Sequence, residues 1–396
     1  MDRKGIEVLD FEAFAKVNTS VAYAASYEFN AVFKVNLNTE NCSYIGMFPD
    51  EKINGKRLYT KALYINGKVY FVPASAKRIA VLDVYSEEMD MLDIEEVDVK
   101  KYPFYKSNAK FNGGIVYQNW IYMIACTYPG IIRIDSETNQ IVYFHDWVGD
   151  GRFVFRKSPV IDQHEFYIPS VINNKVLKFD MDTNIGKLYS VGVHNTGCWS
   201  MCKYGEEFWI APKNPGAVIC WNPNTDKINE YKNYPEGFQD NGFAFTKIYV
   251  SQNELYLIPA YANMGIKISP KDGCMSNSGI FEQKENLTVK FMIETEDAYY
   301  LKILDGEDEK YFYLNMETNQ IRTYLFKFSE GLENYKYEYY KKIAGNTNIL
   351  KEKKSFQLND FLQAVEIFSL DKSVQAVCDK KKTIGEQIFR KVISDL

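Results

Sequence analysis

The feature that most constrains this chain is a repeated strand that ends in a short polar residue and a tight turn. One copy lies in the stretch Glu165 to Asn184, EFYIPSVINNKVLKFDMDTN. Seven copies align on the residue that ends the strand: Asn36, Asp83, Asp135, Asp180, Asn222, Ser269 and Asn315. In five of the seven, Thr stands three residues later. A short side chain that accepts hydrogen bonds from the backbone ahead of it suits a tight connection between strands.

A second strand precedes each copy, and its aromatic positions also superpose: Tyr23, Tyr70, Tyr122, Phe166, Phe208, Tyr256 and Tyr299. A third short strand comes earlier still and ends in a polar turn such as Asn66-Gly67. The copies are 42 to 52 residues apart. Four short strands at such a spacing are typical of a β-propeller blade. The sequence therefore predicts an all-β fold, a seven-bladed β-propeller of four-stranded blades.

The repeat also predicts the domain organisation. We expect blades at 5–50, 51–96, 97–148, 149–193, 194–236, 237–283 and 284–330, so that residues 1–330 form one propeller. Residues 331–396 are predicted to be a linker and a short α-helical C-terminal extension. Phe361, Leu362, Val365 and Phe368 have helical spacing, and Thr383 begins a capping box. We expect these helices to pack on the propeller or on a partner.

Charge and cysteine content limit the partners and the compartment. The net charge of −5 argues against a nucleic acid bound through bulk electrostatics. The seven cysteines have no framework spacing, and the first residues, MDRKGIE, contain no apolar run. Both observations favour a cytoplasmic protein. Residues 111–132 carry no charge, but their Gly and Pro pairs divide them into strand-length pieces, so we predict no membrane span.

A repeated cation on the innermost strand predicts a ligand site at the mouth of the central channel. Three residues after the repeated aromatic position, three blades have a proline, at Pro73, Pro169 and Pro259. The position twelve residues before this proline or its counterpart is Lys61, Lys157, Lys247 or Lys290 in four blades, and Phe14, Gly113 or Trp199 in the other three. The loops between blades add Arg57, Arg152 and Arg156, with aromatic residues nearby. Cations beside aromatic rings suit a phosphorylated or carboxylated ligand that also has a ring or sugar face. The alternative is a solvated channel whose lysines pair with acidic residues of neighbouring blades.

The connections between blades and the loops between second and third strands lie on one face of a propeller, here called the loop face, around the mouth of the channel. Acid–base chemistry has one candidate on this loop face. Of the three histidines, only His194 is expected there, on the connection between blades four and five. An imidazole that caps the loop is the alternative. Asp146 and Asp150 are candidates for holding a hard cation such as Mg²⁺ from the same face.

The sequence motif of each blade, as in IRIDSETNQIVY from Ile132 to Tyr143, resembles the repeats of streptogramin B (virginiamycin B) lyase-like seven-bladed propellers. The resemblance concerns scaffold positions over residues 5–330. It implies a magnesium ion with nearby His and Glu that opens a cyclic depsipeptide by elimination, and only His194 corresponds in location. The Tyr-x-Ile-Pro motif also resembles that of uncharacterised bacterial propellers associated with surface-glycan gene clusters.

Two hypotheses follow. In the first, a cytoplasmic propeller binds an anionic small molecule, a glycan intermediate or a partner protein at the loop face of the channel. In the second, a metal-assisted lyase or related enzyme works at the same mouth. A binding module needs only complementary shape and charge, whereas an enzyme also needs an acid or base within reach of one bound atom. The sequence leaves open whether the protein is an enzyme.

Overall fold

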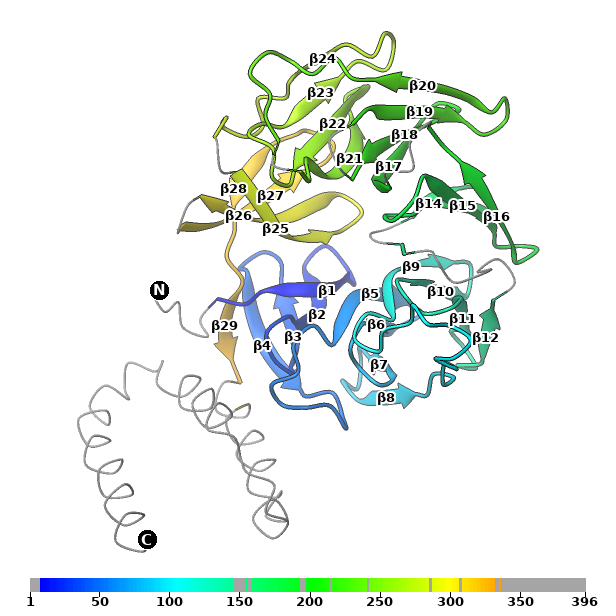
Figure 1. The fold of residues 1–396 in the computed structure, drawn as a ribbon. Coiled ribbons are helices and arrows are strands. Elements are labelled where there is room, and N and C mark those ends of the chain that lie inside the picture. Colours follow the sequence, from blue (N-terminus) through cyan, green and yellow to red (C-terminus); the bar gives the residue numbers. More distant parts are fainter. Residues whose placement is uncertain are drawn as a thin grey trace, which may run out of the picture.

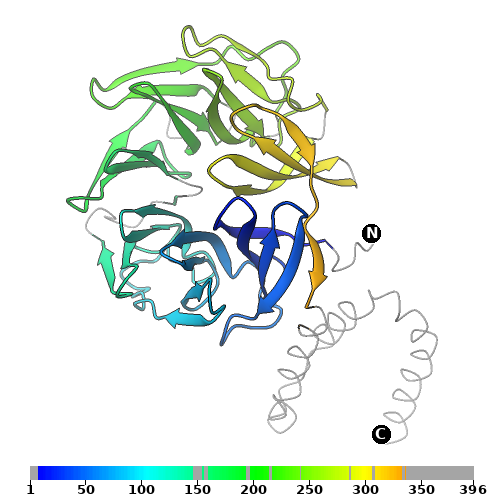
Figure 2. The ribbon, with the colours of Figure 1, turned by 180° about the vertical axis from the view of Figure 1, so that it is seen from behind.

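The chain is a ring of seven sheets around a central channel (Figure 1), and the view from behind shows the same ring (Figure 2). The structure, a computed structural model, describes residues 8–145, 154–155, 159–192, 197–213, 216–240, 242–284, 287–305, 308–331 and 335. The predicted seven-bladed propeller of four-stranded blades is confirmed. The predicted helices of residues 331–396 lie outside the described part, apart from Gly331 and Tyr335.

Each blade is an antiparallel meander whose strands run outward from the channel in chain order. Blades 1 to 3 comprise β1–β4 (Phe11–Lys16, Val21–Ser26, Val32–Asn36, Asn41–Gly46), β5–β8 (Tyr59–Ile65, Lys68–Pro73, Ile79–Asp83, Met89–Leu92) and β9–β12 (Phe111–Tyr117, Trp120–Ala125, Ile131–Asp135, Ile141–Phe144). Blades 4 and 5 comprise β13–β16 (Val160–Asp162, Glu165–Pro169, Lys175–Asp180, Ile185–Ser190) and β17–β20 (Cys198–Tyr204, Glu207–Pro212, Val218–Asn222, Lys227–Tyr231). Blades 6 and 7 comprise β21–β24 (Phe245–Ser251, Glu254–Pro259, Ile266–Ile268, Met275–Asn277) and β25–β28 (Leu287–Glu294, Ala298–Asp305, Asp308–Asn315, Ile321–Thr323). The described part of the chain contains no helix that is long and apolar enough to cross a membrane.

The repeated turn connects the third and fourth strands of each blade. In blade 3, one carboxylate oxygen of Asp135 accepts hydrogen bonds from the backbone amides of Glu137 (2.9 Å) and Thr138 (2.8 Å). The fourth residue after the strand end has a positive φ in all seven blades: Glu40, Glu87, Asn139, Asn184, Asp226, Gly273 and Asn319. The seven aligned positions are therefore structurally equivalent, as the sequence predicted.

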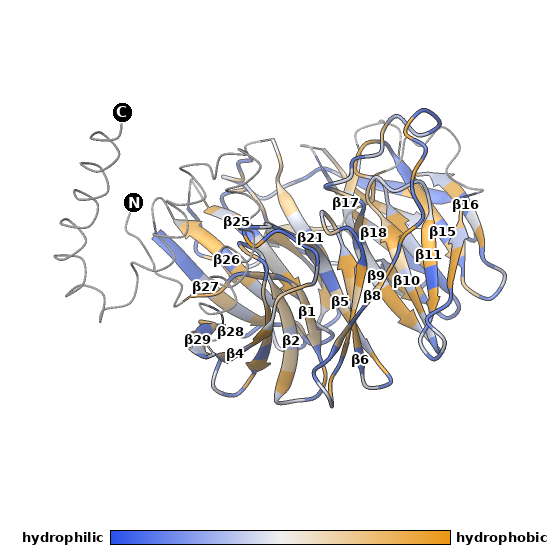
Figure 3. Cartoon of the chain, turned by 90° about the horizontal axis from the view of Figure 1, so that it is seen from below, coloured by the Kyte–Doolittle hydropathy of each residue, from blue (hydrophilic) through white to orange (hydrophobic). Residues whose placement is uncertain are grey.

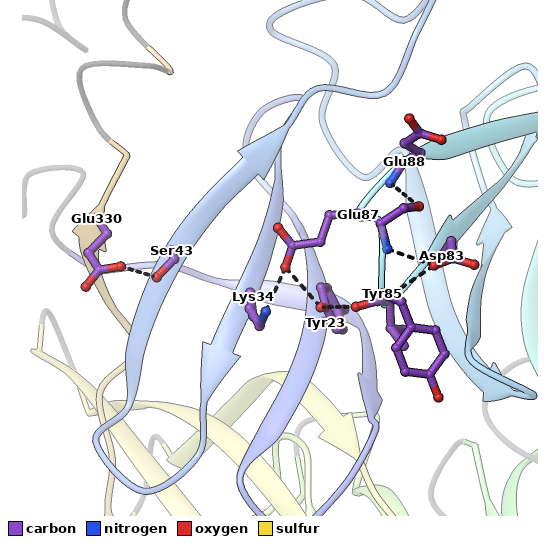
Figure 4. A network of polar contacts seen from close by, with 10 residues as sticks. Tyr23, Lys34, Ser43, Asp83, Tyr85, Glu87, Glu88 and Glu330 are labelled. Atoms are coloured by element: carbon purple, nitrogen blue, oxygen red, sulfur yellow. Dashed lines mark hydrogen bonds and ion pairs between the residues drawn. The ribbon is translucent and has the colours of Figure 1, made fainter.

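The same turns also fasten one blade to the next. The hydroxyl of Tyr70 in blade 2 donates to the backbone oxygen of Ser136 (3.2 Å) and to the side chain of Asn139 (2.8 Å) in the turn of blade 3. Tyr122 bonds in the same way to Met181 and Asn184 of blade 4. In blade 1, Tyr23 reaches Glu87 of blade 2 at 3.2 Å (Figure 4). The polar turn is thus an inter-blade contact as well as a local connection.

Strand register corrects the alignment of the second strands. Tyr70 pairs with the residue two before the strand end, and the residues that pair there in blades 4, 5 and 7 are Tyr167, Trp209 and Tyr300. The sequence alignment had placed Phe166, Phe208 and Tyr299 at this position, one residue too early. In these three blades two aromatic residues are adjacent, so the aromatic pattern does not distinguish the two registers.

The hydrophobic core consists of seven clusters, each between two neighbouring blades. The cluster between blades 2 and 3, for example, joins Leu63 and Ile65 to Phe111, Ile121 and Met123. Figure 3 shows the corresponding distribution, with apolar residues along the strands and mostly hydrophilic turns. A blade therefore buries its faces only when both neighbours are in place.

Ring closure uses a strand that follows the last blade. β29 (Lys327–Glu330) pairs in parallel with β4, which makes the sheet of blade 1 five-stranded. Glu330 accepts a hydrogen bond from Ser43 at 2.9 Å (Figure 4). Just before β29, Phe326 packs on Phe11 and Phe14 of β1. The two ends of the propeller are thus joined by backbone pairing and by aromatic packing.

Two ion pairs also connect blade 7 to blade 1. The ammonium of Lys302 lies 2.7 Å from Asp10 and 3.1 Å from Glu309, and the side chains of Lys302 and Asp10 are only 9% and 13% exposed. Burial, the largest single influence, opposes the charge, but the hydrogen bond and charge of Asp10 together with Tyr311 raise the pKa of Lys302 above its usual range. Lys16 and Asp297 form the second pair at 2.9 Å, with side chains 32% and 48% exposed.

These two pairs give a matched test of ring closure. Lys302→Met leaves Asp10 buried without its cation, so we expect it to lower the free energy of unfolding by about 3–5 kcal/mol. Lys16→Met removes an exposed pair across the same boundary and should cost less than about 1 kcal/mol. Urea denaturation of both variants measures the difference. Equal losses would show that the buried pair does not hold the ring closed.

Candidate functional site

A cavity of about 810 Å³ lies in the central channel. It is lined by inner-strand residues of five blades together with two turns: Phe14–Thr19, Lys61–Tyr64, Gly114–Val116, Pro159, Ile161 and Glu294–Glu296. The turns are the connections from the first to the second strand in blades 1 and 7. The cavity therefore extends toward the face opposite the loop face on which the sequence placed the ligand site.

Two lysines contact one residue, Glu294, in this channel. The ammonium of Lys247 lies 2.7 Å from a carboxylate oxygen of Glu294, and their side chains are 7% and 20% exposed. Lys61 donates to the backbone oxygen of Glu294 at 3.2 Å. Among the described residues, Lys61 has no carboxylate within ion-pair distance. The carboxylate of Glu294 is thus paired with Lys247 and not with Lys61.

The environment of Lys61 disfavours its charge. Burial lowers the pKa of Lys61, the charge of Glu294 partly restores it, and the neighbouring ammonium of Lys247 lowers it further. Desolvation and a like charge act in the same direction on an amine. An anion that enters the cavity would offset both.

The sequence predicted that the lysines occupy one equivalent position on the innermost strands, and two of them do. Lys61 pairs with Val72 and Lys247 with Ile258, each next to the repeated Pro and just after a bulge. Lys290 is instead the extra, exposed residue of the bulge in β25, and Trp199 is the extra residue of the bulge in β17. The prediction of one shared position was therefore wrong for Lys290 and Trp199, because the second strands of blades 5 and 7 were aligned one residue too early.

Trp199 lies on the loop-face side and does not line the cavity. Its ring packs edge-on against Phe243, with 4.3 Å between the ring centroids, and its side chain is buried.

The guanidinium of Arg57 is paired with other side chains of the protein. It donates two hydrogen bonds to the carboxylate of Glu12, of 2.7 and 2.9 Å, and one to the side-chain oxygen of Asn112 at 3.0 Å. Burial opposes its charge, but the bonds to Glu12 raise the pKa of Arg57. Glu12 and Asn112 occupy the bulges of blades 1 and 3, so Arg57 links three adjacent inner strands. This is the pairing with neighbouring blades that the sequence offered as the alternative to a ligand site.

Several predicted site residues lie outside the described part of the chain: His194, Asp146, Asp150, Arg152, Arg156 and Lys157. The two described histidines, His145 and His164, do not line the channel cavity. His164 lies with Glu165 and Asp180 so that one possible ligand atom of each falls within 4.8 Å of the others.

Sequence reasoning missed Glu294. This residue ends the innermost strand of blade 7, and no acidic residue recurs at that position, so the repeat gave no signal for it. A second cavity, of about 370 Å³ between blades 2 and 3, was also missed. It is lined in part by Lys110, whose ammonium donates to the backbone oxygens of Ala76 (2.8 Å) and Ser107 (2.6 Å).

Similarity to known proteins is found in structure and not in sequence. No family model matches the chain, and no curated protein does. A catalytically inactive virginiamycin B lyase from Staphylococcus aureus, solved with quinupristin, superposes with a TM-score of 0.56 at 10% identity, covering 76% of this chain and 94% of the lyase. A streptogramin B lyase structure gives 0.53 at 12% identity, with 81% and 94% covered. The computationally designed protein Ika8 gives 0.53 at 10% identity, with 81% and 88% covered.

At these identities the likeness shows the fold alone. The sequence motif of the blades indicated a resemblance to streptogramin B lyase-like propellers. The structures confirm this resemblance for the scaffold.

The environment of Lys61 beside Glu294 predicts that the stability of the fold depends on pH. Because the pKa of Lys61 is lower in the folded chain, the unfolded chain binds more protons there, and stability rises with pH up to the ordinary value of 10.5. Glu294→Gln removes the charge that supports both ammoniums, so we expect a loss of about 3–5 kcal/mol near neutral pH. Part of that loss should be regained as the pH rises and the lysines deprotonate.

Thermal midpoints of the variant and the parent protein across the alkaline range measure this. Glu296→Gln is the matched control, since Glu296 lines the same cavity but is exposed. Parallel pH curves for Glu294→Gln and the parent would show that Glu294 does not support the lysines.

Proposed function

We propose that this propeller binds a small anionic ligand inside its channel, with Lys61 as the counter-ion. The observation that carries the proposal is that Lys61 lies at the wall of a large cavity beside Glu294, whose carboxylate is already paired with Lys247. Among the described residues, the ammonium of Lys61 has a backbone oxygen as its hydrogen-bond partner and no carboxylate. An anionic ligand would supply the missing countercharge. A charged hydrogen bond to such a ligand is stronger than one to a carbonyl group.

The walls of the cavity indicate the rest of the ligand. They include the apolar residues Phe14, Leu63, Ile115, Pro159 and Ile161, beside the polar cluster at Glu294, and the first three of these also belong to the buried clusters between blades. The volume of about 810 Å³ falls within the range of small-molecule sites. A carboxylate or phosphate attached to an apolar ring or to a sugar face fits this combination, and a phosphorylated glycan intermediate belongs to the same class.

We also propose a cytoplasmic location. The described cysteines Cys42, Cys126, Cys198, Cys202, Cys220 and Cys274 are all free thiols. Free thiols in this number are usual where the environment is reducing. The metal-assisted lyase stays a prediction, because His194, Asp146 and Asp150 lie outside the described part of the chain.

A thermal-shift screen tests the binding proposal. The probes are aromatic carboxylates such as phenylacetate, sugar phosphates and nucleotide sugars, since a ligand that binds the native state raises its melting temperature. For a probe that binds, Lys61→Met should weaken binding by about 1.5–3 kcal/mol, roughly 10- to 150-fold in dissociation constant.

Lys187→Met is the matched control, because Lys187 is an exposed lysine on the outermost strand of blade 4. It should leave the shift unchanged. Equal weakening by the two variants would mean that the probes respond to net charge and not to the channel, and would contradict the proposal.

A further inference from the structure

Lys61 is half-buried, and its amine differs from those of the buried lysines of the described chain in what holds it. Lys247 is neutralised by Glu294, and Lys302 lies between Asp10 and Glu309. Lys110 donates to two backbone oxygens in a cavity less than half as large. Lys61 has one weak partner, a backbone oxygen at 3.2 Å, and lines the 810 Å³ channel cavity. Its amine is therefore both accessible to a ligand and lightly restrained.

A lysine is a nucleophile only when it is neutral. Burial in apolar surroundings and an adjacent ammonium both favour the neutral amine, and together they are how proteins activate a lysine toward carbonyl compounds. Lys61 is subject to both: burial, and the charge of the nearby ammonium of Lys247. The charge of Glu294 acts on Lys61 in the opposite direction, but its carboxylate is paired with Lys247.

We infer that Lys61 condenses reversibly with the carbonyl group of an anionic aldehyde or ketone, such as a 2-oxo acid, held in the channel cavity. This deepens the proposed function by naming the ligand class, and it rests on that function. In a 2-oxo acid the carboxylate is bonded to the carbonyl carbon, so one lysine nitrogen can both bond to the carbonyl carbon and lie next to the carboxylate. The neutral amine attacks, and the cation that results stays beside the carboxylate.

The step balances without a further reactant. The ammonium of Lys61 first loses one proton to water in the open cavity. The neutral Nζ adds to the carbonyl carbon, and one of its two protons moves to the carbonyl oxygen to give a carbinolamine. The hydroxyl group then takes one proton back from water, the C–O bond breaks, the oxygen leaves as water, and the nitrogen lone pair forms the C=N bond. The product is a protonated imine on Lys61, and one water is released for each ligand bound. Addition of water reverses the step.

Reductive trapping tests the inference directly. The full-length protein is treated with glyoxylate and sodium cyanoborohydride at neutral pH to low conversion, and the modified lysines are then located by peptide mass spectrometry. Lys61 should carry most of the label, and exposed lysines such as Lys187 should carry little. Excess phenylacetate, an anion without an aldehyde or ketone carbonyl, should protect Lys61. Label spread over the exposed lysines, with Lys61 unmodified, would overturn the inference.

The pH profile separates a reactive amine from a merely accessible one. Lys247→Met removes the like charge and frees Glu294 to pair with Lys61, so labelling of Lys61 should begin at higher pH than in the parent protein. An unchanged profile would contradict the assigned environment. If phenylacetate stabilises the parent but not Lys61→Met, and glyoxylate still leaves Lys61 unlabelled, the anion site stands and the imine is wrong. If no anion binds and Lys61 is not labelled, both are wrong.

Discussion

Burial of each blade against its two neighbours is the constraint on which the rest of this structure depends. The apolar clusters lie between blades and not within them, so an open array would leave two apolar faces in water. Closure between blades 7 and 1 removes those faces, and it is reinforced there by β29 on β4 and by the buried pair of Lys302 with Asp10. The tyrosines of the second strands add polar contacts between neighbouring blades where they reach the next turn.

The candidate site exists only because the ring is closed. Lys61, Lys247 and Glu294 come from blades 2, 6 and 7, and no two of them are close in sequence. The inner strands hold these side chains together in the channel, where partial burial makes charges interact more strongly than at the surface. There, burial and the neighbouring ammonium of Lys247 disfavour the charge on Lys61.

The scaffold was predictable because its signals are local and repeated. Asp135 and its equivalents bond to amides two and three residues ahead, which any single blade reveals. Register was less predictable where aromatic residues are adjacent, as at Tyr299 and Tyr300, since either satisfies the pattern. The site was least predictable: Lys61 and Lys247 follow the repeat, whereas Glu294 occurs once. The pairing of Arg57 with Glu12 depends on contact between neighbouring blades that no sequence spacing encodes.

Lys61 has no carboxylate partner among the described residues, and we propose that an anion binds beside it in the channel. Anomalous diffraction from crystals soaked in sodium iodide measures this directly, because iodide is an anion whose position can be located without assumptions about the ligand. The account predicts an anomalous peak in the channel cavity beside Nζ of Lys61, and no such peak in crystals of Lys61→Met. A channel without a peak in the parent protein, or a peak that persists unchanged in Lys61→Met, would contradict it.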